Sequence, residues 1–266
     1  MIFYRTCTDR DLPRLKHIWL SCFEEQPDAA DLFFEKNQSS FHAYACEADG
    51  TLVSALYLID CTLDGDCAHY LCGAATLPAY RGRGIMSSLI TYALDDAKQR
   101  GDRYSLLFPA SGSLYDYYAR FGYLSACAAK SALFDADGDT TPCDGAPDLQ
   151  ALQAECSGAG SLRWSDGFLR FAADYYGCYG AETLQSADAY AILRRDDGFA
   201  EVDYAVFSDI NALKALLNAQ GVDRFRLTAA ADSPLFEGGL IKPFGMIRSL
   251  CGDRPPENVY IGITLQ

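Results

Sequence analysis

The spacing of apolar residues changes between residues 67 and 101 of this sequence. Residues 67–77 follow a pattern typical of a strand. The next apolar residues recur one, four and five positions apart, as on one helix face: Ile85, Met86, Leu89, Ile90, Ala93, Leu94 and Ala97. A strand therefore leads directly into a helix through residues 78–84, and Gly101 ends that helix. This change of period, together with the elements around it, predicts a mixed α/β fold.

The remaining elements of the first half follow from the same periodicities and from turn residues. The other expected strands are residues 1–6, 41–47, 52–60, 104–108 and a strand from Tyr123. The other expected helices are one that Thr8 caps, one at 29–37, and one that Ser111 or Ser113 caps. Asp49-Gly50 suits the positive φ angles of a tight hairpin turn.

Residues 135–150 are rich in Asp, Gly, Pro and Thr and offer little to bury. We therefore expect a domain at 1–134, a linker at 135–150 and a second α/β domain at 151–266. The second domain is predicted to contain a helix at 165–177 capped by Ser165, a hairpin of 189–195 with 200–207, a helix that Asp209 caps, and strands at 225–229 and 259–265. Hairpin, helix and strand repeat the order of the first half, which favours a diverged second copy of the same fold.

The charge of the chain excludes several classes of protein. Its 22 Lys and Arg against 36 Asp and Glu give a net charge of −14, which would repel a nucleic acid. The longest run without Asp, Glu, Lys or Arg has 14 residues, whereas a membrane-spanning helix needs about 20 apolar residues. The first twenty residues carry scattered charges instead of the apolar stretch of a secretory signal. We therefore expect a cytoplasmic protein that binds neither membranes nor nucleic acids.

The eleven cysteines are an odd number and contain no C-x-x-C pair. In a cytoplasmic protein this favours reduced thiols that serve as small apolar side chains. A metal site could be drawn from Cys61, Cys67, His69 and Cys72, but the spacings match no common zinc pattern. No metal is predicted.

The junction before the helix contains Arg81-Gly82-Arg83-Gly84. A helix start leaves backbone N–H groups unpaired at the positive end of the helix dipole, where they bind anions. Gly82 and Gly84 let an anion approach the backbone, and Arg81 and Arg83 add positive charge. The sequence lacks the third glycine of a Rossmann fingerprint and the Gly-Lys-Ser/Thr of a Walker loop. It therefore predicts a phosphate cradle of another kind.

Two segments resemble the GCN5-related N-acetyltransferase (GNAT) superfamily. Residues 81–86 are similar to its motif Q/R-x-x-G-x-G/A, and Tyr117-Tyr118-Ala119-Arg120-Phe121-Gly122-Tyr123 is similar to its F-Y-x-x-x-G-F helix end. Met86 departs from the Gly or Ala of the general pattern, although tandem acetyltransferases of the enhanced-intracellular-survival type tolerate Leu or Met there. The resemblance covers about residues 1–130 and implies a GNAT fold, a mostly antiparallel sheet flanked by helices, with acetyl-CoA as co-substrate.

The resemblance also implies roles for individual residues. Backbone groups of Ala74, Ala75 and Thr76 would pair with the pantetheine arm, and Ser111 lies where relatives contact the coenzyme. The backbone N–H groups of Gly82, Arg83, Gly84, Ile85 and Met86, with Arg81, would bind the pyrophosphate. Tyr118 would act as general acid toward the leaving thiolate, and a backbone N–H near Ala75 would polarise the thioester carbonyl. The simpler interpretations are a plain turn at 81–84, core packing for Tyr118 and a helix cap for Ser111.

The base and the acceptor stay open. Candidate bases are His69, Asp60, Glu47, Glu24 and the terminal carboxylate of Gln266, the last because related tandem enzymes use a chain terminus in this way. Residues 1–134 hold 12 Lys and Arg against 16 Asp and Glu, and the rest hold 10 against 20. An acidic second domain that helps to form the acceptor pocket would attract a small cationic amine, although net charge also serves solubility. The alternatives are an acyl-CoA-binding sensor without turnover, or transfer of a longer acyl or aminoacyl group. A homo-oligomer is compatible with the aromatic content.

Overall fold

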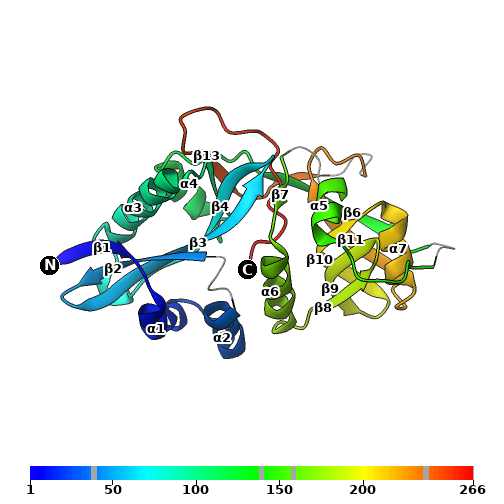
Figure 1. Cartoon of the computed structure of the whole chain (residues 1–266), viewed down its shortest axis with the longest axis horizontal. Helices are drawn as coiled ribbons and strands as arrows, with labels where there is room; N and C mark the ends of the chain where they lie inside the picture. The colour runs from blue at the N-terminus through cyan, green and yellow to red at the C-terminus, as the bar shows by residue number, and fades with distance from the viewer. Residues whose placement is uncertain (37–40, 138–140, 157–159, 236–239, 266) are drawn as a thin grey trace. The chain divides into compact units, whose positions relative to one another are not determined.

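The computed structural model describes residues 1–36, 41–137, 141–156, 160–235 and 240–265 (Figure 1). The chain divides into two compact units, Met1–Leu124 with Met246–Pro255, and Ser125–Gly245 with Pro256–Gln266. The division expected from the sequence, at residues 134 and 150, differs from this one because the strand at Ala128–Asp135 lies in the second unit. Two sheets flanked by helices confirm the predicted mixed α/β class.

The first unit is built on a sheet in the strand order β1-β2-β3-β4-β5-β13. These strands are β1 (Ile2–Thr6), β2 (Phe41–Ala48), β3 (Thr51–Leu63), β4 (Asp66–Thr76), β5 (Tyr104–Leu107) and β13 (Met246–Ser249). All neighbours are antiparallel except β4 and β5, which are parallel. The β2–β3 turn has positive φ at Asp49 and Gly50, as predicted, and the β3–β4 turn has positive φ at Asp64 and Gly65.

Helices cover both faces of this sheet (Figure 1). They are α1 (Leu12–Cys22), α2 (Pro27–Lys36), α3 (Ile85–Arg100) and α4 (Gly112–Ala119), with 3-10 turns at Asp9–Asp11 and Pro78–Tyr80. The apolar face predicted for α3 is buried against Tyr44, Leu56 and Leu58 of β2 and β3. Tyr57, whose side chain points to the opposite face of β3, packs against rings of α1 and α2.

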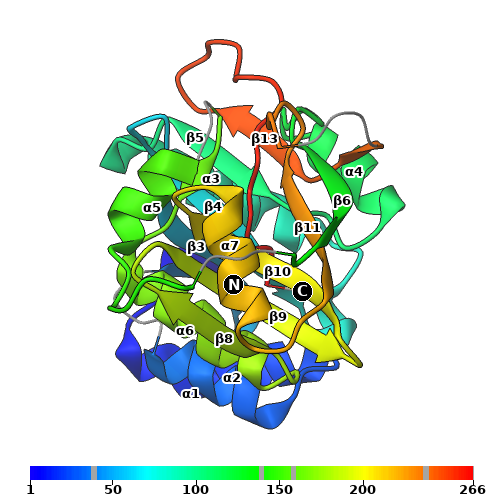
Figure 2. The same ribbon diagram turned by 90° about the vertical axis from the view of Figure 1, so that its right-hand side faces the viewer.

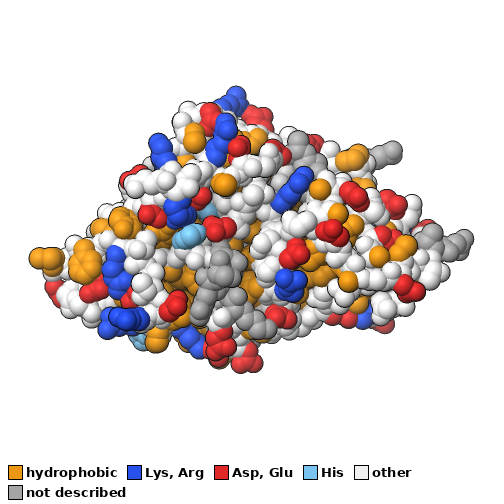
Figure 3. All heavy atoms as spheres, in the orientation of Figure 1, with side chains coloured by type: hydrophobic (Ala, Val, Ile, Leu, Met, Phe, Trp, Pro, Cys, Tyr) orange, Lys and Arg blue, Asp and Glu red, His pale blue; other side chains and the backbone are white. Residues whose placement is uncertain are grey.

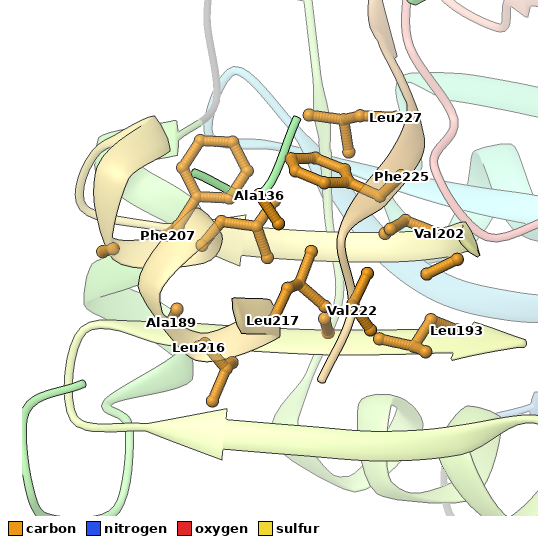
Figure 4. Packing of buried hydrophobic residues seen from close by; sticks show 14 residues of the cluster. Ala136, Ala189, Leu193, Val202, Phe207, Leu216, Leu217, Val222, Phe225 and Leu227 are labelled. Carbon is orange, nitrogen blue, oxygen red and sulfur yellow. The ribbon is translucent and has the colours of Figure 1, made fainter. Parts of the chain in front are cut away.

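The second unit has a sheet in the strand order β12-β6-β11-β10-β9-β8. Its strands are β6 (Ala128–Asp135), β8 (Glu182–Ser186), β9 (Ala189–Asp196), β10 (Phe199–Phe207), β11 (Arg224–Ala230) and β12 (Ile241–Pro243). Its helices are α5 (Leu149–Cys156), α6 (Asp166–Gly177) and α7 (Ile210–Asn218), and a short strand β7 is Leu162–Arg163. Helix α7 lies over the sheet (Figure 2), and Leu213, Leu216 and Leu217 join Val202 and Phe225 in a buried cluster (Figure 4).

The two units repeat one order of elements. In the first, β2, β3, β4, α3 and β5 follow one another, and in the second β8, β9, β10, α7 and β11 do. In each, the last strand is parallel to the strand before the helix. Each unit then takes an antiparallel neighbour from far away in the sequence, because β13 pairs with β5 and β6 pairs with β11.

Most local predictions are confirmed. Ser165 caps α6 by accepting the N–H of Phe168, and Asp209 caps α7 by accepting those of Asn211 and Ala212. Thr8 precedes a 3-10 turn that runs into α1, and Ser111 stands before α4. The end of the predicted helix 29–37 falls on residue 37, which lies outside the described residues.

Two predicted strands are wrong. The strand from Tyr123 begins only at Ala128, because the Tyr123 side chain is buried in the first unit, where its hydroxyl hydrogen-bonds with Ser105. Residues 259–265 form no strand beyond single bridges at Val259 and Tyr260. Their apolar alternation reflects the complete burial of Val259, Ile261 and Ile263 without strand pairing.

Candidate active site

Strands β4 and β5 separate after a short paired stretch. Their parallel register joins only Ala68–Tyr70 to Tyr104–Leu106, while β4 continues to Thr76. Among the described residues, the edge of β4 that faces β5 therefore has no strand partner beyond Tyr70. Ala74, Ala75 and Thr76, whose contact with the coenzyme is implied by the GNAT resemblance, all lie on this free part of β4.

A bulge interrupts β4 at the same place. Ala75 pairs with Ala55 and Cys72 with Tyr57, so that Gly73 and Ala74 together stand opposite Leu56 alone. Gly73 has φ +59°, in the left-handed region that favours glycine. Because a bulge re-aims backbone groups, it can turn an N–H away from β3 toward a ligand.

Gly73 also lies against an aromatic wall. A Cβ atom there would be 2.3 Å from Cζ3 of Trp19 and 2.7 Å from Cδ2 of Tyr57. The Trp19 ring packs 4.4 Å from that of Phe33 and 5.6 Å from that of Tyr57. The role of Gly73 was not predicted from the sequence, although a glycine inside a strand pattern is a signal for a bulge or a close approach.

We expect Gly73→Ala to lower the free energy of unfolding by about 2–4 kcal/mol, because it adds backbone strain and forces the aromatic rings apart. Gly50→Ala is the matched control: it also has positive φ, but nothing lies within 4 Å of its added Cβ. Urea titrations compare the two variants. Equal losses would contradict the close packing at Gly73.

The junction between β4 and α3 forms an open loop of backbone donors. Gly82 and Gly84 have φ +73° and +74°, and a Cβ atom at either would meet nothing within 4 Å. Successive N–H groups in such a turn, followed by a helix start, form a concavity that suits anions. Gly82, Arg83 and Gly84 are exposed, whereas Ile85 is buried under the first turn of α3.

The side chains of the two arginines in the loop donate hydrogen bonds to backbone carbonyls of the same segment. The Nε of Arg81 donates to the carbonyl of Thr76 (2.8 Å), and Nη2 of Arg83 donates to that of Ala79 (2.9 Å). The Arg83 guanidinium also lies 5.2 Å from the centre of the Tyr80 ring. Each guanidinium has five N–H donors, so both retain donors for a ligand.

A pocket of about 220 Å³ lies at this junction. Thr76, Tyr80, the loop glycines, Met86, Ser87 and Tyr117 line it. Met86 is half-buried and packs partly on the core of the first unit. Ser87 and Tyr117 hydroxyls are 3.3 Å apart, and the Arg120 guanidinium lies 4.9 Å from the Tyr117 ring.

Tyr118 lies on α4 and is 8% exposed. Burial raises its pKa to about 12, with smaller contributions from Tyr117 and from Cys72 on β4. Among the described residues, its hydroxyl has no hydrogen-bond partner. A phenol that stays protonated at neutral pH and is not engaged elsewhere can donate a proton to a bound group. Ser111 is exposed, and its hydroxyl lies 3.1 Å from that of Ser113 without capping α4.

The candidate bases are dispersed. His69 is fully buried, with Nδ1 2.7 Å from Oδ2 of Asp102 and with no partner for Nε2 among the described residues. Asp60 is exposed and pairs with His42, and Glu47 pairs with Arg5. Glu24 is exposed, and Gln266 lies outside the described residues. The burial and pairing of His69 favour a structural role.

His69 predicts a pH dependence of stability. Burial lowers its pKa below 6.5, against the opposing effect of Asp102, so the folded protein keeps it neutral. The unfolded chain binds a proton near pH 6.5, and the free energy of unfolding therefore falls as the pH drops below that value, by up to about 1.4 kcal/mol per pH unit. Urea midpoints of wild type and His69→Gln between pH 7.5 and 5 test this. Equal slopes would contradict it.

The described residues contain no group of three or more His, Cys, Asp or Glu arranged to hold a metal ion. None of the helices in the described part of the chain is long and apolar enough to cross a membrane. On the face that Figure 3 shows, acidic and basic side chains are interspersed.

Residues 3–126 match the family model described as acetyltransferase (GNAT) domain. No curated protein sequence matches the chain. Three solved structures each match over 94% of it. A conserved protein of unknown function from Enterococcus faecalis V583, a probable N-acyltransferase, is 17% identical with a TM-score of 0.74, over 72% of that chain. A GCN5-related N-acetyltransferase from Kribbella flavida is 16% identical, with a TM-score of 0.70, and the match covers 71% of that chain. Eis1 from Mycobacterium abscessus is 18% identical, with a TM-score of 0.69, and the match covers 74% of that chain. At these identities the likeness shows a shared fold across both units.

Proposed function

We propose that the chain transfers an acetyl group from acetyl-CoA to a primary amine of a small acceptor, with Tyr118 as general acid, because residues 3–126 match the acetyltransferase (GNAT) domain model. The observation that carries this proposal is the convergence of three features within the first unit. These are the free edge of β4 at its bulge, the glycine loop before α3, and the buried Tyr118 phenol.

The coenzyme would bind through backbone groups. The N–H groups of residues 82–86 and the free donors of Arg81 and Arg83 would hold the pyrophosphate. The pantetheine amides would pair with the free edge of β4 at residues 74–76, in the manner of an added strand. Thr76, Gly82 and Met86 line one pocket, which is consistent with this path.

Acetyl transfer then requires three things: deprotonation of the amine, stabilisation of the oxyanion and protonation of the leaving thiolate. The amine must lose a proton to water or to one of the candidate bases before it attacks, since only about 0.04% of an ordinary lysine-like amine is neutral at pH 7. A backbone N–H at the bulge near Ala75 would stabilise the oxyanion as the nitrogen bonds to the carbonyl carbon. When the carbon–sulfur bond breaks, the Tyr118 hydroxyl would donate its proton to the leaving thiolate. Burial raises the pKa of the neighbouring Cys72 thiol, and a coenzyme thiolate in this environment would likewise favour its protonated form.

The acceptor is proposed to be cationic. The chain has 36 acidic and 22 basic residues, and this net negative charge would attract a cation at long range. Attraction of this kind is weakened by salt, because charges farther apart than about 10 Å are screened at 0.1 M ionic strength.

Release of free coenzyme thiol from acetyl-CoA tests both parts of the proposal. Spermidine and an aminoglycoside should be acetylated with a higher kcat/KM than glutamate, whose body is acidic, and the difference should shrink with added salt. Turnover with no preference for cationic amines would contradict the proposed cationic acceptor but not the proposed acetyl transfer. Binding of acetyl-CoA without turnover of any amine would instead support a sensor.

A further inference from the structure

The second unit contains its own pair of diverging parallel strands. Strands β10 and β11 are paired only from Phe199–Val202 to Arg224–Leu227, after which β10 continues to Phe207 and β11 to Ala230. This repeats the divergence of β4 and β5 in the first unit. In the described part of the chain, the facing edges beyond Val202 and Leu227 therefore have no strand partners.

A cavity of about 130 Å³ lies between the diverging strands. Tyr204–Phe207 of β10 and Leu227–Ala230 of β11 form two of its walls, and Cys156, Tyr260 and Gly262 are also among its lining residues. A cavity of roughly this size in a protein core holds one benzene ring. It has room for one aromatic ring or a short alkyl chain, and its lining is largely apolar.

Several neutral polar groups that line the cavity already form hydrogen bonds within the protein. The Tyr260 hydroxyl donates to the carbonyl of Thr228 (2.7 Å), and the Thr228 hydroxyl lies 2.7 Å from that of Ser131. The Tyr204 hydroxyl donates to Oε1 of Gln153 at 3.4 Å. These groups fix the shape of the cavity more than they offer contacts to a ligand.

The carboxylate of Asp232 differs from them. Asp232 is exposed and is one of the residues that line the cavity, and its carboxylate forms no hydrogen bond or ion pair with any residue in the described part of the chain. One unpaired negative charge beside an apolar cavity favours a ligand with a positive charge next to an apolar body.

The nearby helix start does not offer a phosphate site. The Asp209 carboxylate accepts the N–H groups of Asn211 (2.7 Å) and Ala212 (3.1 Å) at the start of α7. The loop between β10 and α7 is also only two residues long, Ser208 and Asp209, against the eight residues 77–84 in the first unit. A phosphate would meet a carboxylate here, so a coenzyme-like ligand does not fit this unit.

We propose that the cavity between β10 and β11 binds a small organic cation with an apolar body, its ammonium group paired with Asp232. This site is separate from the proposed acetyl-CoA site, since all its lining residues belong to the second unit.

Calorimetric or ligand-detected NMR titration of the full chain tests the proposal with three probes of one shape: benzylamine, benzyl alcohol and benzoate. Benzylamine should bind about fivefold or more tightly than benzyl alcohol, and benzoate should bind most weakly. Asp232→Asn should abolish the advantage of benzylamine and leave benzyl alcohol unchanged. Asp144→Asn, an exposed acidic residue of the same unit that does not line the cavity, should change nothing.

A second variant tests the location. Cys156→Leu adds side-chain volume in the cavity wall and should weaken all three probes, and a thermal melt establishes that the variant is folded. Equal binding of the three probes, an Asp232→Asn variant that retains the preference, or no binding of benzylamine by the wild type would each overturn the proposal.

Discussion

Tyr118→Phe is expected to lower kcat about 10²- to 10³-fold and to leave the affinity for acetyl-CoA within about twofold. The ring packs edge-on against Tyr117 and Tyr123, with centroids 5.3 and 6.0 Å away, and phenylalanine keeps both contacts. Only the hydroxyl is lost, and among the described residues it has no hydrogen-bond partner whose loss would destabilise the fold. Steady-state release of coenzyme thiol, together with a calorimetric titration, measures both quantities.

Tyr115→Phe is the matched control for this experiment. Tyr115 is on the same helix and packs against the same core, but it lies three positions earlier. Its variant should keep kcat within about twofold of the wild type. If Tyr118→Phe also kept its kcat, the proton would come from water or another group, and the assignment of Tyr118 would be lost.

A chain that ends at residue 134 is expected not to form a stable first unit, although the sequence alone places a domain boundary there. Strand β13 pairs with β5 from Met246 to Ser249, and Met246, Ile247 and the adjoining Leu250 are almost completely buried. Burial of three such side chains contributes about 5–8 kcal/mol, which is comparable with the whole stability of a typical domain. We expect the truncated chain to be aggregated or unfolded by circular dichroism and sedimentation.

A second shortened chain separates the loss of β13 from the loss of the second unit. Leu124 and Ile247 exchange backbone hydrogen bonds of 2.8 and 2.9 Å, so a short glycine-rich linker can join residue 124 to residue 246. The chain 1–124 joined to 246–255 should fold cooperatively and bind acetyl-CoA. Cooperative unfolding of the 1–134 fragment at the wild-type denaturant concentration would contradict the role of β13.

The glycine loop before α3 could be predicted from the sequence because its determinants are local. A strand pattern, two glycines and a helix pattern occur within about 35 residues, and positive φ at Gly82 and Gly84 follows from the need to turn tightly between them. The caps Ser165 and Asp209 were predictable for the same reason, since a side chain that accepts the N–H groups of the next turn needs no distant partner.

The pairing of β6 with β11 and of β13 with β5 could not be predicted from the sequence. The apolar pattern of β6 indicates a strand but not its neighbour, and no strand was predicted at β13, because pairing between segments far apart in the sequence depends on the whole fold. Residues 259–265 were misleading for a related reason: alternating burial without strand pairing gives the same sequence pattern as a paired strand. The role of Gly73 depends on rings from α1 and β3 that only the folded chain brings to it.

Calorimetric titration of wild type, Gly84→Glu and Gly65→Glu tests most directly whether the loop before α3 holds the phosphates of acetyl-CoA. Both glycines have positive φ and open space around them, so both variants bear similar backbone strain, but of the two only Gly84 lines the pocket before α3. We expect binding at micromolar strength or tighter for the wild type and for Gly65→Glu, and a loss of about 100-fold or more for Gly84→Glu, because a carboxylate would stand where the pyrophosphate binds. Equal affinities for the two variants would contradict this role of the loop.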